Sequence, residues 1–500
     1  MSETNSTVTT EDFEKIDIRV GRVIDVQPFP ADADRQTPFR GTEPWRTGRQ
    51  RQCRHTASRL GCSPRRKAVL MRFTFLILPL LSCCLSCSAQ DTPKLDKATQ
   101  QKLRQVAVDL SSAQNAENEV EVKRLAKKAI ETLGDQAGIP EIADQCREVP
   151  KNAKPLTPKE LPTAFDPYID FIEKQKWWNL GLDPAKTNHL PRELATIIEG
   201  CLAARSVNEA NAERLLKIAT EAGDFLVWSQ DQAGTGVIPF PAVRNGKGRP
   251  FEVAERFMRQ AEKEGKLDQV VRNGWAVEDF NDGGLQFDNG LGGAALVQLF
   301  EATKDDKYKQ AAIRAADWAA KRPVVTNWNY NSFSVFLLAE IFRITGDTKY
   351  LESARKKTRL GILPGQLTEG PRKGRWADAH NARPPYHYIM VRGLAALAAV
   401  MPRDDADLPS IVESLRLALS ARNPDFEKGV FNADSSVEAL VRVKKLPPHV
   451  AEKLADCNTN EALQTLERYA AEGFRARKSP LGPGAWGQLL AYRKGHQVDE

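Results

Sequence analysis

Histidine and cysteine are scarce in this 500-residue chain, which contains six histidines and eight cysteines. Five cysteines lie before residue 90, and the other three, Cys146, Cys201 and Cys457, are far apart. The three cysteines beyond residue 90 do not form the pairs of a zinc site, so we expect neither a metal ion nor another cofactor. One stretch is unusual against this background, because His380 and His387 place two of the six histidines within eight positions.

Apolar runs long enough to cross a bilayer, which takes about 20 residues, are also missing. The run at residues 73–81 is only nine residues long, follows a Met-Arg pair and leads into small residues that end at Ala89. A basic start, an apolar centre and a small-residue end are typical of a secretory signal peptide. We therefore predict a signal peptide at residues 71–89 and an exported protein, either periplasmic, secreted or an outer-membrane lipoprotein with its lipid on Cys83. The alternative is a buried apolar segment.

Acidic residues are nearly absent from one region, which accounts for the basic balance of the chain. Residues 35–67 contain ten lysines and arginines but only one acid, Glu43, and therefore carry a charge of +9. Since the whole chain carries +7, the remainder carries −2. The excess charge belongs to a low-complexity stretch and not to a folded face, so we expect no nucleic-acid partner.

A signal peptide that starts at residue 71 indicates that residues 1–70 are a disordered or mis-read extension. Within this extension, "DFEKIDIRVGRVIDVQPFP" at residues 12–30 resembles the first strand of an OB-fold tRNA-binding domain. The other strands of that barrel are missing, and one strand cannot close a barrel or bury a core. We therefore expect no tRNA binding. Residues 90–162 form a helical, proline-rich lead-in, and the main domain covers residues 163–495.

An internal repeat indicates how the main domain is built. Residues 299–318 align with residues 341–360 at an offset of 42, and Asp305 matches Asp347. Each copy predicts the end of one helix, a tight turn capped by the aspartate, and a second helix. The first helix of each pair is apolar on all sides and the second is amphipathic, which is typical of an inner and an outer helix.

The same alternation of apolar and amphipathic helices continues along the chain. Further inner helices are predicted at residues 191–205, 388–400, 434–443 and 485–495, and further outer helices at residues 208–228, 408–422 and 460–477. Five or six such pairs predict an all-α fold, an α/α toroid of six hairpins, because each apolar inner helix then has an apolar neighbour on both sides. The alternative is an open solenoid, but the irregular inserts at residues 229–251 and 361–385 favour the toroid.

The loops that precede the inner helices differ from those that follow them. They are rich in Asn, Asp, His and Trp, whereas the loops after the inner helices are short capped turns. All inner helices of a toroid point the same way, so these polar loops meet at one end, where helix N-termini favour polar and anionic ligands. Exposed aromatic rings among polar side chains suit sugars. The predicted substrate-binding residues are His189, Asn289, Asn327, Trp328, Asn329, Asn331, Trp376, Asn381 and His387.

Three short motifs carry a family resemblance. "FLVWSQDQAGTGVIPFP" at residues 225–241, the Asn-Asp-Gly-type loops within residues 280–290 and "GDTKYLESA" at residues 346–354 are similar to segments of α/α-toroid carbohydrate-active enzymes. Toroid pectate lyases and unsaturated-glucuronyl hydrolases resemble the chain most, over about residues 165–495. The resemblance implies an α/α toroid that acts on a polysaccharide or oligosaccharide. The motifs fit several families, so the reaction stays open.

The stretch "RWADAHNARPPYHY", residues 375–388, holds the groups that a polysaccharide lyase needs. Such an enzyme neutralises the carboxylate of a uronic acid, removes the C5 proton and protonates the leaving oxygen. We predict His380 as the base, Tyr386 as acid or base, and Arg383 with Asn381 for the substrate carboxylate. The basic segment at residues 371–375 adds positive charge for an anionic polymer.

Two other functions remain open. A glycoside hydrolase needs two carboxyl groups about 5–10 Å apart, and the predicted pair is Asp288 with Asp378, with Asp279 and Asp282 as further candidates. The third possibility is a non-catalytic glycan-binding or scaffold lipoprotein. In that case the aspartates are turn formers beside glycines and His380 is a solvated loop residue. The sequence does not indicate an oligomeric state.

Overall fold

The computed structural model describes most of the chain from residue 95 onward. The described residues are 16–19, 22–26, 95–142, 145–175, 190–244, 249–279 and 283–496. The predicted signal peptide at residues 71–89, Cys83, His189 and Asp282 lie outside them. Strands β1 (Ile16–Arg19) and β2 (Arg22–Val26) form a two-stranded sheet of their own. None of the described helices has both the length and the apolarity needed to cross a membrane.

Six helices form a closed inner ring. They are α5 (Pro191–Ala204), α9 (Gly284–Thr303), α11 (Trp328–Thr345), α13 (Pro384–Val400), α15 (Ala433–Val443) and α18 (Pro483–Gly495). Each packs against the next in this order, and α18 packs against α5, which closes the ring. The predicted α/α toroid is therefore confirmed, and an open solenoid is excluded because its first and last inner helices would not touch.

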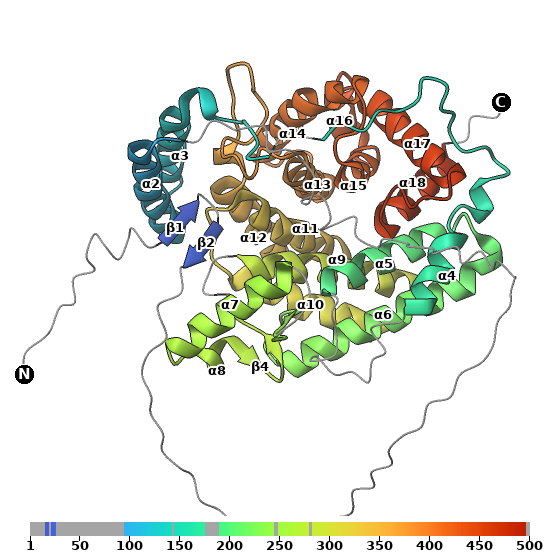
Figure 1. The fold of residues 1–500 in the computed structure, drawn as a ribbon, viewed down its shortest axis with the longest axis horizontal. Coiled ribbons are helices and arrows are strands. Elements are labelled where there is room, and N and C mark those ends of the chain that lie inside the picture. Colours follow the sequence, from blue (N-terminus) through green and yellow to red (C-terminus); the bar gives the residue numbers. More distant parts are fainter. Residues whose placement is uncertain are drawn as a thin grey trace, which may run out of the picture. The chain divides into compact units, whose positions relative to one another are not determined.

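Outer helices surround this ring. They are α6 (Ala212–Ala233), α10 (Asp306–Lys321), α12 (Thr348–Gly361), α14 (Leu408–Arg422) and α17 (Thr459–Arg475), and each packs against the inner helix that precedes it in this hairpin series. Helix α4 (Asp166–Gln175) contacts the segment that starts α18, because Tyr168 donates a hydrogen bond to the carbonyl of Leu481. In Figure 1 the inner helices are enclosed by α14 and α17 at the top and by α6 and α10 at the bottom.

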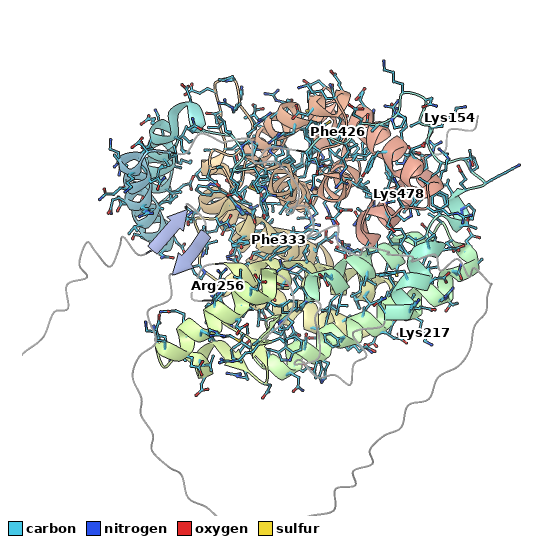
Figure 2. The ribbon with its side chains drawn as sticks, viewed as in Figure 1. Lys154, Lys217, Arg256, Phe333, Phe426 and Lys478 are labelled. Atoms are coloured by element: carbon cyan, nitrogen blue, oxygen red, sulfur yellow. The ribbon has the colours of Figure 1, made fainter. Side chains whose placement is uncertain are left out.

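Burial explains why the inner helices are apolar on all sides. Helices α9, α11 and α13 each pack against two inner neighbours and two outer helices, so nearly every side chain in their central turns is buried. Figure 2 shows Phe333 of α11 among the inner helices and Lys217 of α6 at the outer surface. An amphipathic outer helix buries only one stripe of side chains.

The internal repeat has the geometry that the sequence predicts. Asp305 and Asp347 cap α10 and α12, accepting the backbone N–H two residues later at 3.0 and 3.1 Å. The matched tyrosines Tyr308 and Tyr350 each donate to an aspartate of the preceding outer helix, at 2.7 and 2.9 Å. The repeat therefore encodes both the turn and the link between neighbouring outer helices.

A small sheet in the insert after α6 is not foreseen by the sequence. Strands β3 (Phe240–Pro241), β4 (Val271–Arg272) and β5 (Trp275–Ala276) pair antiparallel in the order β3-β5-β4. Helices α7 (Arg249–Lys263) and α8 (Leu267–Val270) lie between β3 and β4 in the chain. Strands of two residues are too short to show an alternating pattern, so no sequence pattern marks them.

The lead-in contains a helical hairpin that packs against the toroid. Helix α2 (Lys97–Asn115) pairs with α3 (Glu119–Leu133), and α3 packs on α12. The buried amide of Gln114 donates to the carbonyl of Leu360 at 3.0 Å, and Lys356 pairs with Glu117 at 2.8 Å. This hairpin lies within the segment that we predict to be the lead-in, residues 90–162.

Glycines permit the ring to close between α5 and α18. A Cβ added to Gly200 would lie 2.2 Å from the carbonyl oxygen of Pro483, and one added to Gly487 would lie 2.2 Å from that of Gly200. Both clashes are with backbone atoms, which cannot rotate away. The two helices therefore approach more closely than any side chain at these positions allows.

We expect Gly487→Ala to destabilise the protein by about 2 kcal/mol or more, since overpacking against backbone forces the helices apart. Urea denaturation would measure the change. Gly495→Ala at the end of the same helix is the matched control, because nothing lies within 4 Å of its added Cβ. Equal stability of the two variants would contradict the close approach of α5 and α18.

Candidate functional site

The starts of the inner helices lie at one end of the ring, which we call the mouth. Three contacts between neighbouring inner helices show this, because each joins residues in or just before the first turns of two helices. Arg192 of α5 contacts Asp288 of α9, Asn329 of α11 contacts Asn381 before α13, and Asp434 of α15 contacts Gly482 before α18. Helix N-termini carry partial positive charge and unpaired N–H groups. The mouth is therefore suited to polar and anionic ligands, as the sequence predicts.

At the side of the mouth formed by α5 and α9, Arg192 holds Asp288 in a two-point ion pair. The Nε atom of Arg192 lies 2.9 Å from Oδ1 of Asp288, and Nη2 contacts Oδ2. The guanidinium lies 3.7 Å from the ring centre of Phe287. Burial opposes the charge on Arg192, but the attraction of Asp288 outweighs it and the pKa of Arg192 is raised. Both oxygens of Asp288 are thus engaged, and its side chain is only 1% exposed.

At the start of α13, three of the predicted catalytic residues lie together, and two of them contact a carboxylate from the lead-in. The rings of His380 and Tyr386 lie 4.1 Å apart between centroids, and Arg383 lies 5.4 Å from the ring centre of Tyr386. Glu141 lies 3.5 Å from both His380 Nδ1 and Arg383 Nη1. His380, Arg383 and Tyr386 are all partly exposed, so a base, a cation and a phenol share one accessible site.

A buried amide network fixes the loop that carries His380. The amide of Asn381 donates to both oxygens of Asp378 at 3.0 Å and its oxygen accepts from Asn329 at 2.8 Å. The Nδ2 atom of Asn329 also reaches Asn327, at 2.7 Å. Burial raises the pKa of Asp378, and hydrogen bonds from Asn381 oppose this. These four residues tie the loop to the start of α11 and are at most 7% exposed.

Two asparagines predicted to bind substrate instead support the core. Asn289 accepts from the N–H of Ile238 and donates to the carbonyl of Ala315, each at 2.9 Å. Asn331 accepts from the N–H of Val325 at 3.0 Å, and its Nδ2 donates to several carbonyls. Both side chains are fully buried. They are not placed to contact a sugar, because backbone groups already use their amides.

The aromatic residues Trp328, Trp376 and His387 are also core residues. The indole of Trp376 donates to the carbonyl of Ile362 at 2.9 Å, and Trp328 lies against Gly365, whose added Cβ would be 2.4 Å from the indole. His387 lies 3.0 Å from the carbonyl of Ala418 through Nε2. Burial lowers the pKa of His387 well below its ordinary value. The prediction of substrate contacts fails here, because sequence does not distinguish an inward-facing ring from one at the mouth.

Below the mouth, charged side chains fill the axis of the ring. Arg442 of α15 reaches Glu340 of α11 at 2.6 Å, although α13 separates these helices in the ring. Arg392 pairs with Glu438 at 2.5 Å. Burial, and then the charge of Glu438, raise the pKa of Glu199 to about 7. Ion pairs therefore span the axis of the ring below the mouth.

Asp434 is a mouth residue that sequence reasoning did not select. It lies in the first turn of α15 and accepts from the N–H of Gly482 at 2.6 Å. Burial raises the pKa of Asp434 to about 6, and Glu438 adds to this, whereas Arg147 opposes it. Its side chain nevertheless keeps partial exposure, as expected in a recess. Asp434 ends the polar loop at residues 430–434, which leads into a predicted inner helix. This position is the sequence signal that could have identified it.

Two further residues escaped prediction. Glu141 belongs to the lead-in, and only the folded chain brings it to His380, so no local pattern marks it. Arg192 directly follows Pro191 at the start of a predicted inner helix. Such a position is expected to lie at the mouth, so the sequence could have identified it. In the described part of the chain, no three His, Cys, Asp or Glu side chains gather as metal ligands would.

Comparisons with known proteins find similarity at the level of structure. No family model matches the chain, and no curated protein does. A solved polysaccharide lyase is 11% identical, with a TM-score of 0.41 over 69% of this chain and 99% of its own. A family 88 glycosyl hydrolase from Bacteroides vulgatus is 12% identical, with a TM-score of 0.37 over 68% of this chain and 99% of its own. The unsaturated glucuronyl hydrolase of Streptococcus agalactiae is 14% identical, with a TM-score of 0.37 over 71% and 98%.

The chain is therefore similar to α/α-toroid polysaccharide lyases and unsaturated glucuronyl hydrolases, as the sequence suggests. These identities and TM-scores are low. The toroid architecture is shown by the contacts of the six inner helices themselves, which α5 and α18 close into a ring.

We expect Arg192→Ala to destabilise the protein by about 3 kcal/mol, because it leaves the buried carboxylate of Asp288 without its partner. Urea denaturation would measure the loss, and Arg192→Ala/Asp288→Ala should recover part of it. Arg259→Ala is the control, since its ion pair with Glu255 on α7 is largely exposed and such pairs contribute little. A wild-type stability for Arg192→Ala would contradict a buried pair.

The raised pKa of Asp434 predicts a pH dependence of stability. Its pKa is about 6 in the fold against an ordinary value of 3.8, so the folded state binds the proton more tightly. The stability from this group is therefore fully present below about pH 4 and is lost as pH rises through 6. We expect Asp434→Asn to lose less stability than the wild type between pH 4 and 6 in urea titrations. The exposed Asp404, changed to Asn, is the control; parallel curves for all three proteins would argue against the shift.

Proposed function

We propose that the chain is an exported enzyme that cleaves an acidic, uronic-acid-containing glycan by β-elimination at the mouth. The observation that supports this most is that His380 and Arg383 both contact Glu141 in a partly exposed site, where the ring of Tyr386 packs against that of His380. A base, a fixed cation and a phenol are the groups that β-elimination next to a carboxylate requires.

Each residue has a chemical role in this proposal. The guanidinium of Arg383 neutralises the substrate carboxylate, which makes the C5 proton acidic enough to remove. The proton passes to Nε2 of His380, whose Nδ1 faces Glu141. The C4–O bond then breaks as the C4–C5 double bond forms, and the hydroxyl of Tyr386 protonates the departing oxygen. Atoms and charge balance without an oxidant or a metal.

The surroundings of these residues support their roles. The network of Asn381, Asp378 and Asn329 holds the loop before α13 in one position, and a base acts only when it is held within reach of its proton. Across the mouth, Arg192 stands over the partly exposed ring of Phe287. Phe333 stacks on the same ring with centroids 4.1 Å apart, so this surface offers a neighbouring sugar the edge of Phe287 and the partly exposed guanidinium of Arg192.

Hydrolysis is the second candidate, and Asp434 is the observation that favours it. A carboxyl group with a pKa raised to about 6 suits a general acid near neutral pH. The pair that the sequence predicts for hydrolysis, Asp288 with Asp378, is less suited to act as acid and base. Arg192 holds both oxygens of Asp288, and Asn381 holds both oxygens of Asp378. A glycan-binding protein without activity is the third candidate.

Export is part of the proposal and rests on the sequence of residues 71–89. Expression in a Gram-negative host, followed by fractionation, tests it. Processing after Ala89 would leave a periplasmic or secreted protein. Lipid attachment to Cys83 would leave the protein with the membranes, and cytoplasmic, unprocessed protein would contradict export.

We expect His380→Ala and Tyr386→Phe each to reduce turnover about 100-fold or more, as loss of a general base or acid does. The assay follows the ultraviolet absorbance of the unsaturated product on polygalacturonate, alginate, hyaluronan and chondroitin sulfate. His496→Ala and Tyr492→Phe are matched controls, because this pair has the same ring separation of 4.1 Å at the far end of α18.

Other outcomes separate the candidates. New reducing ends without absorbance, lost in Asp434→Asn but kept in His380→Ala, would replace elimination with hydrolysis. Full turnover in both His380→Ala and Tyr386→Phe would remove these residues from the chemistry. Binding without any cleavage of the four polymers would indicate a glycan-binding protein.

A further inference from the structure

We propose that a basic groove beside the mouth binds the carboxylate or sulfate groups of a glycan chain as it leaves the cleavage site. The groove lies between the loop at residues 366–376 and helix α14, and has a volume of about 330 Å³. Its lining residues are Pro371, Arg372, Lys373, Arg375, Arg416, Leu417, Ser420 and Ala421. This inference rests on the proposed function for the identity of the polymer.

Cations outnumber acids in and around this groove. Asp425 is shared by three of them, lying 3.8 Å from Arg375, 3.4 Å from Arg422 and 3.8 Å from Lys428. Glu413 is used by Arg416 in a close pair at 2.7 Å. The guanidinium of Arg372 meets backbone carbonyls of the lead-in, at 3.1 and 3.4 Å.

Four basic side chains, Arg372, Lys373, Arg375 and Arg416, are among the residues that line the groove, and none of these lining residues is acidic. Lys373 is exposed, whereas Arg372 and Arg375 are partly exposed. A concave surface with such an excess of one charge concentrates ligands of the opposite charge. The groove is thus complementary to a chain that carries one anionic group on every second sugar or more.

The loop that carries these cations is held rigidly on α14. Gln366 donates to the carbonyls of Gly374 and Ser414 at 3.1 and 3.0 Å, and accepts from the hydroxyl of Ser414 at 2.7 Å. Gly374 has a φ of +90°, and an added Cβ would lie 2.0 Å from the carbonyl oxygen of Leu417. Only glycine fits this contact. A groove built in advance loses less entropy when a ligand binds.

The groove continues into the site at the mouth. Arg375 lines the groove, and the chain runs from it through Trp376 to His380, five residues later. Outer helices run opposite to inner ones, so the second half of α14, which supplies Arg416 and Ser420, lies at the mouth end of the ring. The buried His387 of α13 contacts Ala418 in this half of α14. A polymer cleaved beside His380 thus has the groove directly along its path.

An anionic glycan fits the groove better than a nucleic acid does. None of the described residues that line it is aromatic, whereas single-stranded nucleic acids rely on bases stacked on aromatic rings. The cations are also concentrated in one short pocket. A polyuronate or sulfated glycan needs charge and hydrogen bonds from Arg, Lys and Ser, which the groove supplies.

The test compares Lys373→Ala/Arg416→Ala, which removes two cations that line the groove, with a control that removes the same charge elsewhere, Lys217→Ala/Lys321→Ala on the outer helices α6 and α10. Fluorescence anisotropy measures binding of a labelled twelve-sugar heparin fragment and a polygalacturonate fragment of equal length. We expect the groove variant to bind about 5-fold or more weakly and to show a smaller salt dependence, since two charges are lost. The control should remain within about 2-fold of the wild type.

Two further measurements separate this inference from the proposed function. His380→Ala should lose turnover but keep wild-type binding of both fragments. The groove variant should keep wild-type turnover on the shortest cleaved oligosaccharide and lose it only on polymer. Equal binding by the groove and control variants, or no binding of either glycan by the wild type, overturns the inference. Preferential, groove-dependent binding of a single-stranded DNA of the same length also overturns it.

Discussion

The close contact between α5 and α18 is the constraint on which the architecture depends, because it joins the first inner helix to the last. Gly200 and Gly487 let the two backbones meet at distances that no side chain permits. A ring of helices is stable only if every apolar inner helix has two apolar neighbours, and an open seam would expose both end helices to water. Closure also gathers the helix starts at one mouth, so the candidate site depends on contacts far from its own residues.

Much of this fold follows from the sequence. The alternation of apolar and amphipathic segments predicts the helices closely, and residues 408–422 were predicted with the observed bounds of α14. The capped turns at Asp305 and Asp347 follow from a local rule, the preference of aspartate for N-caps. The small sheet after α6 does not follow, because its strands have two residues each and are held by their surroundings.

The site was predictable as a region but not residue by residue. Asn327 and Asn331 are the same residue type four positions apart, yet one joins the network under the His380 loop and the other holds the backbone at Val325. Such roles depend on the direction in which a side chain points after packing. Glu141 lies far from His380 in sequence, so no local pattern links the two. The pair of Arg442 with Glu340 likewise forms only because the fold places α15 and α11 on opposite sides of the axis.

The docking of the α2–α3 hairpin has a consequence for how far the toroid can be trimmed. Gln114 enters the core beside Leu360, Arg372 holds the backbone near Asp135, and the segment that follows α3 delivers Glu141 to the loop before α13. A fragment that begins at residue 163 would contain every inner and outer helix of the toroid. It would still lack the lead-in residues that pack against α12 and the loop before α13. A stable fragment of this protein is therefore expected to begin before α2, because the lead-in packs into the core and supplies Glu141 to the candidate site.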